Sequence, residues 1–201
     1  MAAPSDLITV VSGIPRSGTS LAMQMVAATG IEPLVDDARP PDASNPRGYF
    51  ELDAVKRMPR LGTDWLTQAR GRSVKVIHAL LEFLPRDVSY RVVYMERDLD
   101  EVIASQDRML ERQGEATGAE GGLPKARLRE ILEKQNAAAI ALLESERCFE
   151  LECFTHRTLM IDPARSAERM AAFLGCEDAA PAIAAHVDPA LYRERTESAG
   201  S

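Results

Sequence analysis

A short glycine-containing segment near the N-terminus has the residue types of an anion-binding loop. Residues 13–20 read Gly-Ile-Pro-Arg-Ser-Gly-Thr-Ser, and the two glycines have the spacing of a P-loop. In such a loop, backbone N–H groups and the N-terminus of the following helix face a bound anion. Gly18 lets the backbone close around an oxyanion, and Thr19 and Ser20 add hydroxyl donors. Arg16 adds a permanent charge whose planar fork suits phosphate or sulfate, so we expect an anion site here.

The same loop lacks two parts of a nucleotide-hydrolysing P-loop. Those enzymes carry Lys after the second glycine, and a separate strand Asp helps to hold magnesium. Here Thr19 takes the lysine position. The apolar run at 92–95 is followed by two acids, Glu96 and Asp98, with Arg97 between them. We therefore expect an anion site that works without a metal, and these absences disfavour the alternative of a magnesium-dependent kinase or NTPase.

Alternating strands and helices would position this loop. A short apolar, β-branched run predicts a strand at residues 7–12, and further apolar runs predict strands at residues 74–77, 91–95 and 149–154. Helical patterns lie at residues 21–28, 99–112, 125–146 and 163–174. This alternation predicts an α/β, P-loop-type three-layer fold with a central, mostly parallel sheet flanked by helices. The length of 201 residues fits a single domain, with a flexible C-terminal tail from about residue 193.

Composition disfavours several functional classes. The chain carries 24 Lys and Arg against 31 Asp and Glu, and this net charge of −7 argues against a general nucleic-acid binder. Three cysteines without C-x-x-C spacing favour a reducing compartment, and three scattered histidines do not suggest a zinc site. The longest apolar run, residues 137–143, is too short to span a bilayer, and no cationic leader is visible. We expect a cytoplasmic protein with no nucleic-acid or membrane partner.

The loop resembles the 5'-phosphosulfate loop of the PAPS-dependent sulfotransferases, which use 3'-phosphoadenosine 5'-phosphosulfate (PAPS) as donor. That family carries Pro-(Lys/Arg)-Ser-Gly-Thr-(Thr/Ser), and residues 15–20 match it at every position. The arginine form is most similar to the tyrosylprotein sulfotransferases and to small bacterial sulfotransferase-like proteins. The resemblance implies that Arg16 contacts the sulfuryl group that is transferred. It also implies that the 5'-phosphate is bound by the rest of the loop: Ser17, Gly18, Thr19 and Ser20.

A second pair of residues resembles the family's 3'-phosphate site. In the family, an Arg at a strand end and a Ser eight residues later both bind the 3'-phosphate, and Arg97 and Ser105 have this spacing. Asp98 can cap the N-terminus of the predicted helix at 99–112, with Glu101 at the third helical position. Ser105 then faces away from the buried stripe of this helix, roughly 10 Å along its axis. An extended Arg side chain and a phosphate together would bridge that distance.

Sulfuryl transfer needs cations near the departing oxygen and a base for the acceptor. Arg16 is the first candidate for the cation, and Lys75, at the end of the second predicted strand, is the second. Two candidates for the base rank together. Cytosolic sulfotransferases use a His two residues after a comparable Lys, whereas His78 follows Lys75 by three; the tyrosylprotein branch uses a Glu after the first helix, a part that Glu51 could play. Further acids in that segment are Asp36 and Asp37.

The resemblance implies a small-molecule acceptor with a hydroxyl or amine group. Residues 33–48 and 113–124 are rich in Pro or Gly and predict loops of the kind that often line binding sites. An acceptor pocket formed by residues 33–60 and the Gly-rich loop would contain Tyr49 and Phe50, with Trp65 as a further candidate, which suits a hydrophobic or aromatic acceptor. One further alternative is a catalytically idle protein that keeps only the site for PAP, the desulfated product.

Overall fold

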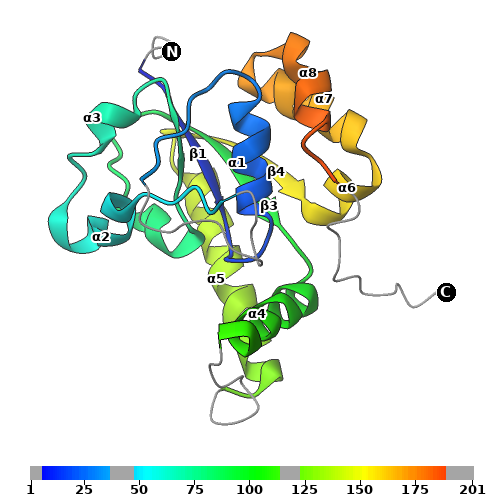
Figure 1. The fold of residues 1–201 in the computed structure, drawn as a ribbon. Helices are drawn as coiled ribbons and strands as arrows, with labels where there is room; N and C mark the ends of the chain where they lie inside the picture. Colours follow the sequence, from blue (N-terminus) through cyan, green and yellow to red (C-terminus); the bar gives the residue numbers. More distant parts are fainter. Residues whose placement is uncertain (1–5, 37–47, 114–122, 189–201) are drawn as a thin grey trace.

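The computed structural model describes residues 6–36, 48–113 and 123–188, and a parallel four-stranded sheet lies at its centre (Figure 1). The strands are β1 Ile8–Gly13, β2 Ser73–Lys75, β3 Tyr90–Glu96 and β4 Phe149–Thr155. Their spatial order is β2-β1-β3-β4, and every neighbouring pair is parallel. Each strand lies where an apolar run predicted one. The predicted α/β class is therefore confirmed.

Helices cover both faces of the sheet. They are α1 Thr19–Ala27, α2 Asp53–Leu61, α3 Leu66–Ala69, α4 Leu99–Gln113, α5 Lys125–Ser145, α6 His156–Ile161, α7 Pro163–Leu174 and α8 Ala180–Ala184, with the 3-10 turns η1 His78–Phe83 and η2 Glu177–Ala179. The four helices predicted from the sequence correspond to α1, α4, α5 and α7, and their ends agree within two residues. As predicted, Gly175 ends α7, in the left-handed conformation that favours glycine.

The sheet separates two hydrophobic cores because alternate residues of a strand point to opposite faces. Val10 of β1 packs in the core under α2, α3, η1 and α5. Its neighbour Val11 packs in the core under α1, α6, α7 and α8. Every residue of β1 is buried, as expected of a parallel strand covered on both sides. The molecule is thus a three-layer sandwich of helices, sheet and helices.

Several short elements were not predicted, and α2 shows why. Its N-terminus is capped from a distance, since the Asp53 N–H donates to Oδ2 of Asp36 at 2.5 Å. It also contains Pro59, which disfavours a helix on sequence grounds. Most of the two predicted loops, at residues 37–47 and 114–122, and the predicted tail from residue 193 lie outside the described residues.

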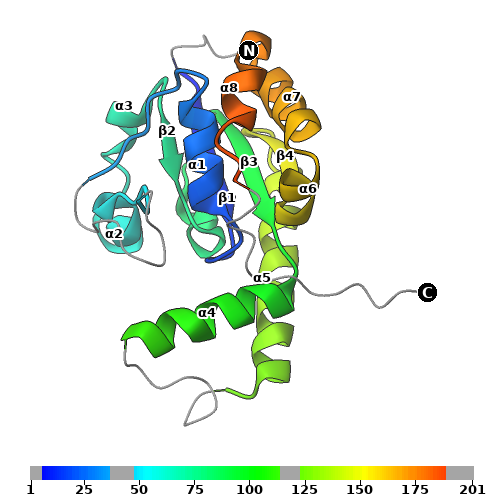
Figure 2. The ribbon, with the colours of Figure 1, turned by 45° about the vertical axis from the view of Figure 1, so that its right-hand side comes forward.

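The order of the strands defines one edge of the sheet as the place for a ligand. The chain passes from β1 through α1 to β2 on one side, and then β3 pairs with the other side of β1. Open parallel sheets bind ligands beyond the carboxyl ends of the strands where the direction of winding reverses. The segments after β1 and β3 meet there, and beyond this edge α4 lies across α5 and packs against it (Figure 2).

Gly13 ends β1 at this edge, and we expect Gly13→Ala to destabilise the protein. Its φ is +143°, and an added Cβ would lie 2.5 Å from the Met95 carbonyl oxygen. Gly62 is a matched control, because its φ is +79° but a Cβ there would meet nothing within 4 Å. Gly62→Ala should cost about 1 kcal/mol of unfolding free energy from backbone strain alone, and Gly13→Ala about 2 kcal/mol more. Urea denaturation measures both, and equal losses would contradict the close approach to Met95.

Candidate functional site

The predicted phosphate loop is a tight turn between β1 and α1. Arg16 has φ +75° and Gly18 has φ +102°, both in the left-handed region that residues with a side chain rarely adopt. Within the turn, the Ser17 N–H donates to the Ile14 carbonyl at 3.0 Å. Helix α1 begins directly after it at Thr19, and its first turn contains no acidic residue. The positive end of this helix therefore faces the turn, as an anion site requires.

The side chain of Ser17 fits a ligand in this loop. It is only 1% exposed, and its Oγ has no hydrogen-bond partner among the residues that the structure describes. Leaving a buried hydroxyl unsatisfied costs about 1–3 kcal/mol, so proteins rarely keep one without a reason. A bound oxyanion would accept a hydrogen bond from this hydroxyl. The predicted role of Ser17 therefore agrees with its burial.

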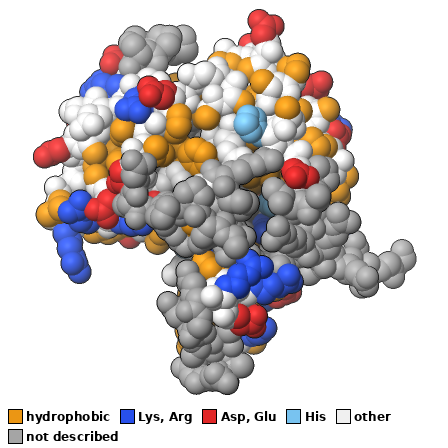
Figure 3. All heavy atoms as spheres, in the orientation of Figure 1, with side chains coloured by type: hydrophobic (Ala, Val, Ile, Leu, Met, Phe, Trp, Pro, Cys, Tyr) orange, Lys and Arg blue, Asp and Glu red, His pale blue; other side chains and the backbone are white. Residues whose placement is uncertain are grey.

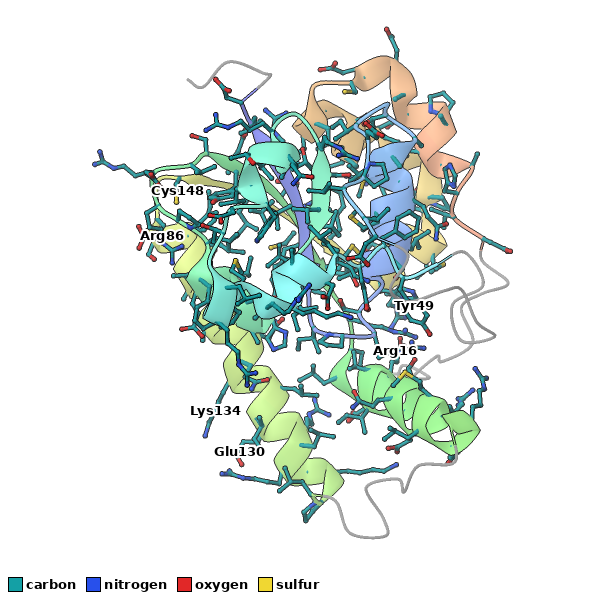
Figure 4. The ribbon with its side chains drawn as sticks, turned by 60° about the vertical axis from the view of Figure 1, so that its left-hand side comes forward. Arg16, Tyr49, Arg86, Glu130, Lys134 and Cys148 are labelled. Atoms are coloured by element: carbon teal, nitrogen blue, oxygen red, sulfur yellow. The ribbon has the colours of Figure 1, made fainter. Side chains whose placement is uncertain are left out.

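Arg16 reaches from the loop to α4. Its Nε donates to Oγ of Ser105 at 3.1 Å, and its Nη1 lies 4.0 Å from Sδ of Met109. Figure 4 shows Arg16 in the space between the loop and α4. Two residues that were predicted to bind opposite ends of a nucleotide are thus in direct contact, although they are 89 positions apart. Ser105 is buried, on the side of α4 that meets the loop.

Arg97 follows β3 and joins the same loop. Its Nη1 donates to the backbone carbonyl of Arg16 at 3.2 Å, and its Nε donates to Oε2 of Glu101 at 3.0 Å. The side chains of this Arg97–Glu101 ion pair are 9% and 4% exposed. Asp98 caps α4 as predicted, because its Oδ1 accepts from the Glu101 N–H at 3.2 Å. The carboxylate of Glu101, however, turns to Arg97.

A second cluster lies beside the loop, around the carbonyl oxygen of Tyr49 (Figure 4). Lys75 Nζ donates to this carbonyl and lies 3.8 Å from Oε1 of Glu51. Ser20, in the first turn of α1, donates to the same carbonyl at 3.5 Å. The other oxygen of Glu51 pairs with Lys56 at 2.6 Å. The structure therefore brings together three residues that the sequence singled out separately: Ser20, Glu51 and Lys75.

The other candidate bases have different surroundings. His78 is buried at the start of η1, with its Nε2 3.2 Å from Oε1 of Gln135 on α5. Asp36 accepts the backbone N–H of Asp53 and so caps α2. Asp37 lies outside the described residues. Glu51, by contrast, lies 3.8 Å from Nζ of Lys75.

His156 is a site residue that sequence reasoning missed. It is the first residue of α6, directly after β4, and its ring touches the loop: a Cβ on Gly18 would lie 2.8 Å from His156 Cδ2. Burial and the nearby Arg97 guanidinium lower the pKa of His156 to about 4, against the opposing effect of Glu101. The imidazole is therefore neutral at pH 7. Its position just after a strand, at the ligand-binding edge, was the available signal.

The aromatic residues expected at an acceptor pocket are mostly buried. Trp65 is a core residue, packed with the side chains of α2 and α3. Tyr49 is 5% exposed, and Phe50 is partly buried, with a left-handed φ of +52°. Trp65 thus belongs to the hydrophobic core, and its place at an acceptor site stays a prediction.

Within residues 6–36, 48–113 and 123–188, no group of three or more His, Cys, Asp or Glu side chains is arranged to hold a metal ion. Among the helices in these same ranges, none is both long and apolar enough to cross a bilayer.

The burial of His156 predicts a pH dependence of stability. Its pKa rises from about 4 in the folded protein to its ordinary value near 6.5 on unfolding. The unfolded chain therefore binds more protons between these pH values, and the free energy of unfolding falls as the pH drops through this range. We expect the wild type to lose about 3 kcal/mol more than His156→Gln between pH 7 and pH 4. Urea denaturation at both pH values measures this loss, and parallel pH profiles would contradict it.

No protein-family model and no curated protein sequence matches this chain. Solved structures do match its fold. Retinol dehydratase in complex with androsterone and the inactive cofactor PAP superimposes with a TM-score of 0.52 and 17% identity, over 94% of this chain and 65% of that chain. The sulfotransferase domain of the Synechococcus PCC 7002 olefin synthase gives a TM-score of 0.51 and 14% identity, over 96% and 84% of the two chains. The resemblance carried by the sequence motifs is thus confirmed at the level of architecture: the chain has the α/β fold of the sulfotransferases.

Proposed function

We propose that this chain is a PAPS-dependent sulfotransferase, which moves a sulfuryl group to a hydroxyl or amine of a small acceptor and releases PAP. One observation carries the proposal: Arg16 of the phosphate loop contacts Ser105 of α4. A nucleotide with anionic groups at its 3' and 5' positions needs two neighbouring anion sites, and this contact joins the two that the motifs predict. The structure of retinol dehydratase, which shares the fold, holds PAP and androsterone, and this supports a nucleotide and an acceptor of these kinds.

The donor would be held at both of its anionic ends. The phosphate loop, with the buried Ser17 hydroxyl and the N-terminus of α1, suits the 5'-phosphosulfate. Arg97 and Ser105 suit the 3'-phosphate, because a guanidinium and a hydroxyl are both good phosphate donors. Arg16 lies between these two groups of donors, since its backbone belongs to the loop and its side chain contacts Ser105. This position suits the role of contacting the sulfuryl group.

The transfer is a single in-line displacement at sulfur. The acceptor oxygen or nitrogen attacks, the bond from sulfur to the bridging 5'-phosphate oxygen breaks, and its electron pair stays on that oxygen of PAP. The acceptor proton passes to a protein base. Negative charge grows on the departing oxygen, and fixed cations stabilise such charge best in a site shielded from water. Arg16 and the buried Lys75 are the cations that we propose for this task.

We propose Glu51 as the base and keep His78 as the second candidate. Glu51 lies 3.8 Å from Lys75 Nζ, next to the Tyr49 carbonyl that also accepts from Ser20 of α1. A base here would stand beside the loop that holds the sulfuryl group. Histidine is the side chain that most often serves as a general base, but Nε2 of His78 is engaged with Gln135 of α5. The geometry therefore favours the carboxylate.

Donor binding can be tested by calorimetry with PAP. We expect Arg16→Ala and Arg97→Ala each to weaken PAP binding about 10- to 100-fold, because each removes a charged hydrogen-bond donor worth about 1.5–3 kcal/mol. Arg70→Ala is the matched control, since Arg70 pairs with Asp6 on the surface near the start of β1. The control should bind PAP as the wild type does. Tight magnesium-dependent ATP binding without PAP binding would instead favour a kinase or NTPase.

Turnover separates an enzyme from an idle binder and tests the base. With labelled PAPS and a library of hydroxyl and amine acceptors, we expect transfer that persists in EDTA, since no step uses a metal. Glu51→Gln should lower kcat about 10²- to 10⁴-fold with PAP affinity unchanged, the usual range for removing a general base. A comparable loss in His78→Asn with Glu51→Gln active would identify His78 as the base. Background transfer to every acceptor by the wild type would contradict the proposed enzyme.

A further inference from the structure

Glu101 is a buried carboxylate inside a site that is otherwise suited to anions. It is 4% exposed, and its Oε2 accepts from Arg97 Nε at 3.0 Å. A fixed negative charge here repels a phosphate or sulfate ligand, and burying it carries a desolvation cost. Stability alone is a weak reason for such a pair, because buried ion pairs often add little to it. The other contacts of Arg97 give a more specific reason for a carboxylate at this position.

A series of three hydrogen bonds starts on α4, passes through the phosphate loop and returns to α4. Glu101 binds Arg97, and Arg97 Nη1 donates to the Arg16 backbone carbonyl at 3.2 Å. The Arg16 side chain returns to α4, where its Nε donates to Ser105 at 3.1 Å. Glu101 and Ser105 are four residues apart and so lie on the same face of the helix, one turn from each other. Helix α4 thus holds both the backbone and the side chain of Arg16.

The backbone of Arg16, which these hydrogen bonds hold, is strained. Arg16 has φ +75°, in the left-handed region where a residue with a Cβ is disfavoured, so other contacts must keep it there. The hydrogen bond from Arg97 to its carbonyl is such a contact. A guanidinium is planar, so fixing its Nε on a carboxylate also fixes the direction in which Nη1 donates.

We propose that Glu101 is a positioning residue: through Arg97 it holds the left-handed turn at Arg16 and so couples the two anion sites. The coupling of donor sites rests on the proposed function, whereas the effect of Glu101 on the loop does not. A purely electrostatic role predicts the opposite sign. If Glu101 only repelled the ligand, its neutralisation would tighten nucleotide binding, whereas loss of positioning weakens it.

Hydrogen–deuterium exchange of the nucleotide-free protein tests the loop directly. In Glu101→Gln, we expect the amides of residues 14–18 to exchange at least tenfold faster than in the wild type, with the amides of β3 unchanged. Glu111→Gln is the control, because it makes the same change on an exposed position of α4. Unchanged exchange of residues 14–18 in Glu101→Gln would overturn the proposal. This readout does not depend on what the site binds.

Nucleotide binding tests the coupling. Adenosine 5'-monophosphate lacks a 3'-phosphate, so it reports on the loop alone. We expect Glu101→Gln to weaken binding of both this nucleotide and PAP at least tenfold, with Glu111→Gln unaffected. Tighter binding, or unchanged binding of adenosine 5'-monophosphate, would overturn the coupling. If the wild type binds neither nucleotide, the proposed function fails while the exchange experiment still decides the role of Glu101.

A second variant covers the case in which Glu101→Gln does not fold because Arg97 loses its buried partner. The double variant Arg97→Gln, Glu101→Gln leaves no unpaired charge from this pair. It should show the same faster exchange at residues 14–18 and the same weaker binding of adenosine 5'-monophosphate. Wild-type exchange and affinity in this variant would overturn the proposal.

Discussion

The hydrogen bond from Arg16 to Ser105 is the interaction on which the site depends, because it brings two distant parts of the chain to one place. The sheet makes this contact possible. Since β1 pairs directly with β3, the loop after β1 and the helix after β3 begin side by side. Both strands are buried by helices on each face, so their ends are fixed in space. The positions of the site residues therefore follow from the packing of the core.

The elements that the sequence predicted correctly are those whose signals are local. The strands are short apolar runs, and α1, α4, α5 and α7 have helical periodicity over nine residues or more. Helix α2 escaped prediction because its N-terminal cap, Asp36, lies 17 positions upstream and because it contains a proline. Helix α6 follows β4 without an intervening loop, so no break marked its start. Tertiary contacts decide both cases, and local patterns do not record such contacts.

In the candidate site, too, the sequence predicted what local patterns determine and missed what tertiary contacts determine. The placement of Arg16 and Arg97 on one edge of the sheet was predictable, because a glycine-rich turn and a strand end lie there, but the direct contact of Arg16 with Ser105 was not predicted. The pairing of Glu51 with Lys75 depends on the path that the chain takes back to the sheet, which no spacing reveals. Trp65 has the residue type of a binding pocket but fills the core. Glu101 was assigned correctly to a helix start, yet only the structure shows its carboxylate on Arg97.

The tilt of α4 sets the distance between Ser105 and the phosphate loop. Ser105 is the seventh residue of α4, about 9 Å along the axis from its start. A ten-degree tilt of the helix about that start would move Ser105 by about 1.6 Å, and a hydrogen bond of 3.1 Å does not survive a change of that size. Helices α4 and α5 project from the main body of the molecule (Figures 2 and 3), so a change in the tilt of α4 would change the distance between Arg16 and Ser105. The geometry of the proposed nucleotide site therefore depends on the angle at which α4 leaves the sheet.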